Sequence, residues 1–401
     1  MWKRYNHILI LSLLLLVYAC ERDEGFNHIY LDDHQHLRSN TSTNIIANFQ
    51  LLESLHPAAS QLAGNVAYGS KVYSISYNTI FQGEEVIASG LVSIPDARGT
   101  FPIISFQNGT NTCNSSAPSS DHDNMLFSLL TMNSGNGFII VIPDYIGFGE
   151  SKEYLHPYYH KESTTRVIRD MILAVEELAD YNAGLELSKE LFLMGYSQGG
   201  WASLAALKDM ENDPLPGYIL RSASCGAGAY DLIDFTHYIL SRETYSKPFY
   251  LPYYIESRRQ NGIMDEDLNL FFKEPYAGMI PGLFDGTLCN NELNSNFTTN
   301  LPELLSEELL TAFDSSEDFI TLRNELTGSG ITAWKVNSPV LITHSNGDQS
   351  VPIKQSFDLL DNLLAAGTDE NNIHFTEIDG LLHNEAAVQW GINSLIWFIN
   401  Q

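Results

Sequence analysis

Residues 190–200 read Glu-Leu-Phe-Leu-Met-Gly-Tyr-Ser-Gln-Gly-Gly, and this stretch contains the pattern G-x-S-x-G around Ser197. The apolar run before it has the length of a buried strand, and the Ala- and Leu-rich run 201–210 after it has helical spacing. Strand, sharp turn and helix are the context in which this pattern is a nucleophile elbow. We therefore expect the Ser197 hydroxyl to stand exposed above a sheet, with the backbone N–H of Gln198 facing a developing oxyanion. A glycine-rich turn with an idle serine is the alternative.

A serine needs a base that is oriented by a third group, and in elbow-type folds the acid and then the histidine follow the serine along the chain. The apolar stretch 338–343 predicts a strand, and the polar turn after it contains Asp348. The stretch 372–378 predicts another strand, followed by a loop with His383 and then a helix over 386–399. Because active sites of open α/β sheets collect at the strands' carboxyl ends, we expect Ser197, Asp348 and His383 to form a catalytic triad.

Each partner of the serine has a rival. Asp379 lies near His383 in sequence, but four residues along one loop do not make an orienting pair. Glu377 falls on the predicted strand, where it is expected to face solvent. His344 precedes Asp348 in the same segment and would break the order of acid before base. We therefore favour Asp348 as acid and His383 as base.

A second oxyanion donor is expected in the loop after the apolar strand 101–106. That loop reads Gln107-Asn108-Gly109-Thr110-Asn111. Such a turn offers free backbone N–H groups, so Thr110 or Asn111 could supply the donor. An Asn/Gly turn without a role is the alternative.

The rest of the chain predicts an α/β fold with a mostly parallel central sheet and helices on both faces. Residues 71–80 alternate between apolar and polar side chains and form a hairpin with 86–94 across a turn at 83–85. Residues 138–142 and 218–224 read as buried strands, and 163–180 as an amphipathic helix. Residues 21–65 read as a polar tether that leads into a first helix near 45–55.

The alternation of strand and helix stops over residues 231–335, where aromatic side chains crowd together. An insertion at this point lies over the edge of the sheet that carries the candidate triad, so we expect a cap. Some of its aromatic side chains are expected to contact substrate, although such residues also serve as packing core.

The N-terminus has the pattern of an exported lipoprotein. Met1-Trp2-Lys3-Arg4 supplies positive charge, and the apolar run 8–17 is too short to span a bilayer, as in a signal peptide. Val17-Tyr18-Ala19-Cys20 then has the form of a bacterial lipobox, so we expect cleavage before Cys20 and lipid attachment to it. Ordinary secretion with cleavage near Ala19 is the alternative. Either way the chain is expected in or beyond the bacterial cell envelope.

Composition limits the partners. The chain has 401 residues and a formal net charge of -28, so a polyanion such as nucleic acid would be repelled. No C-x-x-C spacing is present, and Asp121-His122-Asp123 has no further ligand cluster nearby, so we expect no metal and no cofactor. If Cys20 carries lipid, Cys113, Cys225 and Cys289 allow at most one disulfide, and the pair Cys113–Cys289 is one possibility. The oligomeric state cannot be inferred.

Four stretches can be compared with known families; these are Ser105-Phe106-Gln107 with Ala117-Pro118-Ser119, the elbow 195–200, Asp348 with Val351-Pro352, and His383 ahead of Trp397-Phe398-Ile399. Together they resemble the secretory lipase family of α/β-hydrolases, the group with lipase A type enzymes. The resemblance spans residues 66–401 and is thin in the insertion. It implies a serine ester hydrolase with a cap over an acyl-binding site, with Ser197, Asp348 and His383 in the triad positions. That family often has an acidic residue where this chain has Asn111. The stretch 144–149 also resembles the D-Y-x-G-x-G loop that is common in related esterases, where its expected role is to shape the rim of the site.

The expected organisation is a signal peptide over 1–20, a tether with a helix over 21–65, a hydrolase core over 66–230 and 336–401, and a cap over 231–335. The expected function is hydrolysis of a small-molecule carboxylic ester through an acyl-enzyme intermediate. A serine peptidase and a carbohydrate esterase on the same fold are alternatives. A non-catalytic binding lipoprotein of the envelope is a further one.

Overall fold

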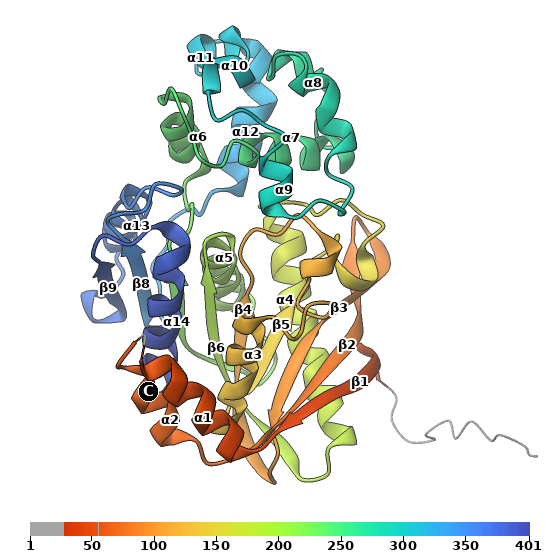
Figure 1. Ribbon diagram of the computed structural model, residues 1–401, viewed down its shortest axis with the longest axis vertical. Coiled ribbons are helices and arrows are strands. Elements are labelled where there is room, and N and C mark those ends of the chain that lie inside the picture. Colours follow the sequence, from red (N-terminus) through yellow and green to blue (C-terminus); the bar gives the residue numbers. More distant parts are fainter. Residues whose placement is uncertain (1–27, 55) are drawn as a thin grey trace, which may run out of the picture.

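The computed structural model describes residues 28–54 and 56–401, and its centre is one nine-stranded sheet. The strands lie in the order β1-β2-β3-β5-β4-β6-β7-β8-β9 (Figure 1). The pairs β1–β2, β2–β3 and β3–β5 are antiparallel, and every other neighbouring pair is parallel. The bounds are β1 Leu31–Asn40, β2 Ser70–Phe81, β3 Glu84–Pro95, β4 Gly99–Gln107, β5 Ile139–Pro143, β6 Leu185–Tyr196, β7 Ile219–Gly226, β8 Val340–Ser345 and β9 Ile373–Ile378.

The predicted hairpin of β2 and β3 is confirmed. Tyr73, Ile75 and Tyr77 on β2 are all buried, whereas Asn78 is exposed, as the alternating pattern requires. Gln82 and Gly83 join the two strands with positive φ angles of 52° and 83°. Two consecutive residues with positive φ match the twist of a two-residue hairpin, and this explains the glycine in that turn.

The prediction of a tether is wrong for residues 31–40, because these residues form β1. β1 pairs with only one neighbour, β2, at the edge of the sheet. Its sequence Leu-Asp-Asp-His-Gln-His-Leu-Arg-Ser-Asn carries few apolar side chains, and only Leu31 is fully buried. Charged and polar side chains are common on edge strands, where they oppose pairing with another chain.

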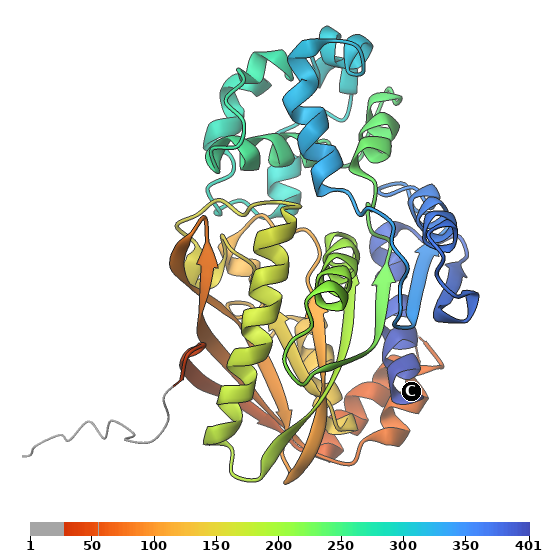
Figure 2. The ribbon, with the colours of Figure 1, turned by 180° about the vertical axis from the view of Figure 1, so that it is seen from behind.

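Helices cover both faces of the sheet, as predicted (Figures 1 and 2). The helices α1, α2, α3 and α14 lie on one face, and α4 and α5 lie on the other. α13 packs beside β8. The helices of this part of the fold are α1 Ser42–Glu53, α2 Ala59–Asn65, α3 Met125–Thr131, α4 Lys161–Leu178, α5 Gln198–Asn212, α13 Lys354–Ala365 and α14 His383–Ile399.

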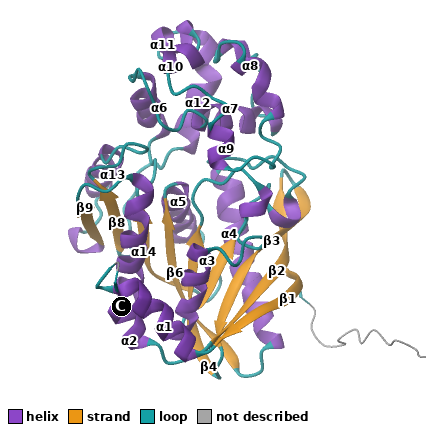
Figure 3. Cartoon of the chain, in the orientation of Figure 1, coloured by secondary structure: helices purple, strands orange, loops and turns teal. Residues whose placement is uncertain are grey.

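Residues 231–335, between β7 and β8, form a group of helices that we call the insertion. The insertion lies above one end of the sheet (Figures 1 and 3). The buried Arg258 ties it down, because its guanidinium pairs with Glu325 at 3.1 Å and donates to the carbonyl oxygen of Tyr158 at 2.7 Å. The helices are α6 Leu232–Leu240, α7 Tyr250–Gln260, α8 Tyr276–Met279, α9 Asn290–Asn294, α10 Leu301–Leu304, α11 Glu307–Ala312 and α12 Ile320–Ser329.

The expected signal peptide and Cys20 lie outside the described residues. Among the residues that are described, no helix combines the length and the hydropathy needed to cross a membrane. The boundaries between core, insertion and tether stay a prediction, apart from the correction at β1.

The register of the parallel strands brings four loops to the same edge. Gln107 at the end of β4 pairs with Gly195 on β6, and Ser345 at the end of β8 pairs with Ile378 on β9. The loop after β4, the turn after β6 and the loops after β8 and β9 therefore open on one side of the sheet, beneath the insertion. This edge is where open α/β sheets place their ligand sites.

Candidate active site

Ser197 occupies a sharp turn between β6 and α5. Its backbone lies at φ 61° and ψ -124°, a region that non-glycine residues seldom adopt. Its N–H donates to the carbonyl oxygen of Gly226 at 2.8 Å. A Cβ on Gly199 would lie 2.0 Å from the carbonyl oxygen of Gln107, so glycine is required where the turn meets β4. The close packing of these strands holds Ser197 in its strained conformation.

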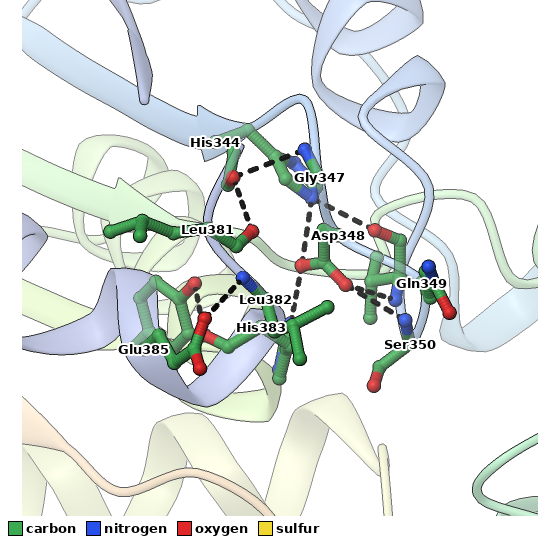
Figure 4. Close-up of polar contacts among 12 residues, drawn as sticks. His344, Gly347, Asp348, Gln349, Ser350, Leu381, Leu382, His383 and Glu385 are labelled. Atoms are coloured by element: carbon green, nitrogen blue, oxygen red, sulfur yellow. Dashed lines mark hydrogen bonds and ion pairs between the residues drawn. The ribbon is translucent and has the colours of Figure 1, made fainter. Parts of the chain in front are cut away.

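The carboxylate of Asp348 is in contact with two histidines. Nδ1 of His383 donates to Oδ2 of Asp348 at 2.5 Å, and Nε2 of His344 lies 3.3 Å from the same oxygen (Figure 4). The other oxygen, Oδ1, accepts hydrogen bonds from the backbone N–H groups of Ser350 and Val351 at 2.8 and 2.9 Å. Both carboxylate oxygens are therefore satisfied inside the protein.

These contacts keep Asp348 ionised. Burial by itself would raise the pKa of this carboxyl, but the hydrogen bonds from His344 and His383 outweigh it and hold the pKa well below the ordinary value of 3.8. A carboxylate that accepts from Nδ1–H of a neutral imidazole fixes its tautomer, so the second nitrogen of His383 is left as a proton acceptor.

His383 is the first residue of α14, not a loop residue as the sequence predicted. The Tyr196 hydroxyl donates to the carbonyl oxygen of His383 at 2.7 Å, and the Glu385 carboxylate accepts from the N–H of Leu382 at 2.9 Å (Figure 4). These two hydrogen bonds fix the start of α14. Nε2 of His383 is buried and has no hydrogen-bond partner among the described residues.

Ser197 and His383 line the same groove, which has a volume of about 430 Å³. Within the described part of the chain, no hydrogen bond joins the Ser197 hydroxyl to Nε2 of His383. Hydrogen bonds between catalytic groups are often long or poorly aligned before substrate binds. The structure thus brings Asp348 and His383 into contact and places the serine beside them.

The rivals of these residues are engaged elsewhere. His344 lies at the end of β8, where Nδ1 accepts from the Ser356 hydroxyl at 2.8 Å and Nε2 donates to the carbonyl oxygen of Val351 at 3.0 Å. The Asn346 amide donates to both Glu377 and Asp379, at 2.7 and 3.0 Å. The contact between His344 and Asp348 was not predicted, since the order of residues along the chain suggested a role for His344 only as a rival base.

The loop after β4 lies directly against the elbow. A Cβ built on Gly109 would be 3.8 Å from the Cβ of Ser197. In the part of the chain that the structure describes, the backbone N–H groups of Thr110 and Asn111 have no acceptor. Gln198 is the first residue of α5, so its N–H has no partner within the helix. The three expected oxyanion donors are therefore free and lie in two adjacent turns.

The insertion holds this loop in place through its backbone. The Asn290 amide donates to the carbonyl oxygen of Thr110 at 2.7 Å, and the Tyr253 hydroxyl donates to that of Asn111 at 3.0 Å. A disulfide joins Cys113 to Cys289 across 176 residues of sequence. Sequence spacing left this pairing open, since only the fold shows which cysteines meet.

In the described part of the chain, neither Cys225 nor the stretch Asp121-His122-Asp123 belongs to a metal-binding arrangement. Cys225 is a buried free thiol whose pKa is raised by burial, which favours the unreactive protonated form. His122 lies 3.1 Å from the Arg38 guanidinium and 3.3 Å from Asp123. No group of three potential ligands that could hold a metal ion occurs within residues 28–54 and 56–401.

His156 was not expected to contact the elbow, but it supports the side chain of Gln198. Nδ1–H of His156 donates to the carbonyl oxygen of Ile146 at 2.8 Å, and Nε2 accepts from the Gln198 amide at 2.9 Å. His156 is buried, and burial lowers its pKa from 6.5 to about 4. The imidazole is therefore neutral near pH 7, as its role as an acceptor requires.

The D-Y-x-G-x-G loop at 144–149 has a structural role at the edge of the candidate site. The buried Asp144 accepts from the hydroxyls of Ser89 and Ser119, each at 2.5 Å, and from the N–H of Ser119 at 2.9 Å. The next residue, Tyr145, donates its hydroxyl to the carbonyl oxygen of Asn108 at 3.2 Å. The loop thereby braces the start of the turn that carries Thr110.

Comparisons with known proteins agree with this architecture. Residues 121–258 match a family model described as Hydrolase_4, serine aminopeptidase, S33. A putative hydrolase from Legionella pneumophila superimposes with a TM-score of 0.82 at 23% identity, covering 93% of this chain and 98% of that one. No curated protein matches the chain.

Two further solved structures are esterases or lipases. The rice cell wall degrading esterase LipA from Xanthomonas oryzae has a TM-score of 0.76 at 20% identity, covering 92% of this chain and 96% of that one. Candida antarctica lipase A in its closed state has a TM-score of 0.64 at 17% identity, covering 92% and 81%. Likenesses at these identities establish the α/β-hydrolase fold, and together with the family match they support a hydrolase.

The burial of His156 makes folding sensitive to acid. Between pH 6.5 and about 4 the unfolded chain binds a proton at His156 that the folded chain excludes, so acidification over this interval favours unfolding. We expect the change His156→Asn to reduce the loss of unfolding free energy over this interval by up to about 3 kcal/mol. Urea unfolding followed at several pH values measures it.

The exposed His374 provides the matched control. The change His374→Asn should leave the pH dependence of unfolding close to that of the unaltered chain. Equal acid sensitivity of the His156→Asn variant and the unaltered chain would contradict the assignment of a neutral, buried imidazole.

Proposed function

We propose that this chain is a serine hydrolase that acts on carboxylic esters through Ser197, His383 and Asp348. The observation that carries the proposal is Nε2 of His383, which has no partner in residues 28–54 and 56–401. This nitrogen belongs to an imidazole that is fixed by Asp348 and lines the same groove as Ser197. A buried imidazole nitrogen without a partner is costly, so a site that retains one is suited to accept a proton.

In the proposed reaction, a modest rotation joins the Ser197 hydroxyl to Nε2 of His383, which accepts the proton as the serine oxygen attacks the ester carbonyl. Asp348 stabilises the resulting imidazolium. The backbone N–H groups of Gln198 and of Thr110 or Asn111 stabilise the oxyanion. His383 then donates its proton to the departing alcohol, and it later activates the water that releases the acid from Ser197.

The family match makes a serine aminopeptidase the second candidate. Such an enzyme needs a negative group to bind the substrate's free ammonium. No Asp or Glu is among the described residues that line the groove, and Lys247 there adds positive charge. Glu303 on α10 accepts hydrogen bonds within the insertion, from the side chains of Thr298 and Asn300. Charge therefore favours the neutral ester.

We also propose that the chain is exported and held in a bacterial envelope by lipid on Cys20. The charged start, the short apolar run and the lipobox pattern support this proposal. The disulfide between Cys113 and Cys289 supports export independently, because disulfides persist in oxidising compartments.

The triad is tested by single substitutions. Ser197→Ala should abolish hydrolysis of p-nitrophenyl acetate and labelling by a fluorophosphonate probe. Asp348→Asn should lower kcat by a factor on the order of 10⁴, because the imidazole would then adopt the wrong tautomer. Steady-state kinetics and labelling of the folded variants give both values.

Asp379→Asn is the matched control for the acid, since Asp379 bonds to Asn346 and not to His383. It should leave kcat nearly unchanged. A slow Asp379→Asn variant beside a fast Asp348→Asn variant would reverse the assignment.

The choice between ester and peptide is tested with paired substrates. We expect kcat/KM for a simple acyl ester to exceed that for an aminoacyl p-nitroanilide by at least about a hundredfold, because the lined groove offers no carboxylate to an ammonium group. Competition assays on one enzyme preparation measure the ratio. Preference for the aminoacyl amide would favour the peptidase.

The anchor is tested by changing Cys20 to Ala. The unaltered chain should incorporate labelled palmitate in a bacterial host and sediment with membranes, and the variant should do neither. Incorporation that persists without Cys20 would overturn the proposed lipidation. Lack of incorporation by the unaltered chain would favour ordinary secretion.

A further inference from the structure

The groove beside Ser197 extends away from the insertion, along α14. Its lining includes His383, Ala387, Gly391 and Leu395, which recur every four residues and so form one stripe on that helix. From His383 to Leu395 the stripe is about 18 Å long at 1.5 Å per residue. The groove is thus an elongated channel rather than a compact hollow over the serine.

The opposite wall comes from α3, and the far end comes from α1 and α2. Leu129 and Leu130 of α3, Phe49 of α1 and Leu62 of α2 line the groove together with α14. All four helices lie on the same face of the sheet (Figure 1). The channel therefore runs down one face of the core, and residues of the insertion also contribute to its lining.

The lining is mostly polar near Ser197, where Phe249 and Tyr250 of the insertion also contribute aromatic rings, and mostly apolar along the helices. Six polar or small members come from the loop after β4 and from the insertion, close to Ser197; these are Asn108, Gly109, Thr110, Lys247, Asn290 and Asn291. Most members from α1, α2, α3 and α14 are apolar. A ligand that matches this lining has a polar reacting group at the serine and a hydrocarbon chain along the helices.

Exposed apolar side chains continue the channel at the surface. Met125 and Leu126 of α3 are 72% and 46% exposed, and Val388 of α14 is 48% exposed. All three also line the groove. Their exposure is unfavourable in the empty protein and is relieved when an apolar chain lies between the two helices.

We propose that this α3–α14 groove binds an unbranched aliphatic chain of the ester substrate, so that the chain leaves the reacting carbonyl along α14 and not beneath the insertion. The inference rests on the proposed ester hydrolysis and names its substrate class. The chain can belong to the acyl part or to the alcohol part of the ester, because the lining recognises only hydrocarbon.

Gly391 offers a way to block the channel without disturbing the fold. It lies eight residues after His383 on α14, about 12 Å along the helix. A Cβ built there meets no atom within 4 Å beyond its neighbours in the helix. The change Gly391→Phe should therefore fill the middle of the groove and leave the site at Ser197 intact.

Gly328 on α12 is the matched control. It too is a helical glycine whose added Cβ would meet nothing within 4 Å, and it is not among the residues lining the groove. Gly328→Phe introduces the same side chain into the insertion, so it reports any general effect of the substitution.

Two ester series distinguish the acyl side from the alcohol side. One series runs from p-nitrophenyl acetate to p-nitrophenyl dodecanoate, and the other from methyl acetate to dodecyl acetate. Only the series that lengthens the chain bound in the groove should respond, with kcat/KM rising by about fourfold per methylene, the factor expected from burial of a methylene. That series identifies the acyl or the alcohol part as the one bound. Gly391→Phe should keep activity on the shortest ester and lose at least tenfold on the longest, whereas Gly328→Phe should match the unaltered chain.

A binding measurement separates this inference from the proposed reaction. In the Ser197→Ala background, bromododecanoate should quench the fluorescence of Trp390, which lines the groove, and Gly391→Phe should abolish the quenching. Quenching in this background, together with no ester turnover by the unaltered chain, would sustain the proposed groove and overturn the proposed function. If ester turnover depended on chain length in the same way in the unaltered chain and in both glycine variants, the proposed binding of the aliphatic chain in the groove would be wrong.

Discussion

The candidate site depends on one constrained turn, in which Ser197 is held at φ 61° between β6 and α5. A non-glycine residue in this region costs on the order of 1–3 kcal/mol, so the surrounding chain must supply the restraint. It does so by contact: the backbone of Gln107 on β4 approaches Gly199 so closely that no side chain fits between them. The same approach brings the loop after β4 against the serine, so one packing constraint positions both the hydroxyl and the candidate oxyanion donors.

Around this turn, charge and hydrocarbon are kept apart. Asp348 is buried among donors from His383, His344 and the backbone of its own loop, so the negative charge is stabilised away from the groove. The groove itself has an apolar lining along α3 and α14. A carboxylate that is fully satisfied can support an imidazole without making the neighbouring channel unfavourable for an uncharged ligand.

The sequence predicted those features that follow from local pattern. The strand, turn and helix around Ser197 and the order of Asp348 and His383 are visible in the chain, because strand ends in a parallel sheet meet at one edge. Polar β1 was missed, since an edge strand needs no apolar alternation. The contact of His156 with Gln198 was missed too, because it joins segments 42 residues apart that only the fold brings together. Sequence spacing likewise could not choose the partner of Cys113.

The fastening of the loop after β4 has a consequence for how a ligand enters. The disulfide to Cys289 and the hydrogen bonds from Asn290 and Tyr253 bind the insertion to the turn that carries Thr110 and Asn111. A rigid lid swinging open on that side would carry the oxyanion donors with it and dismantle the site. The insertion therefore stays fixed relative to this turn. An entrance along α14 would let substrate bind and product leave without moving the oxyanion donors.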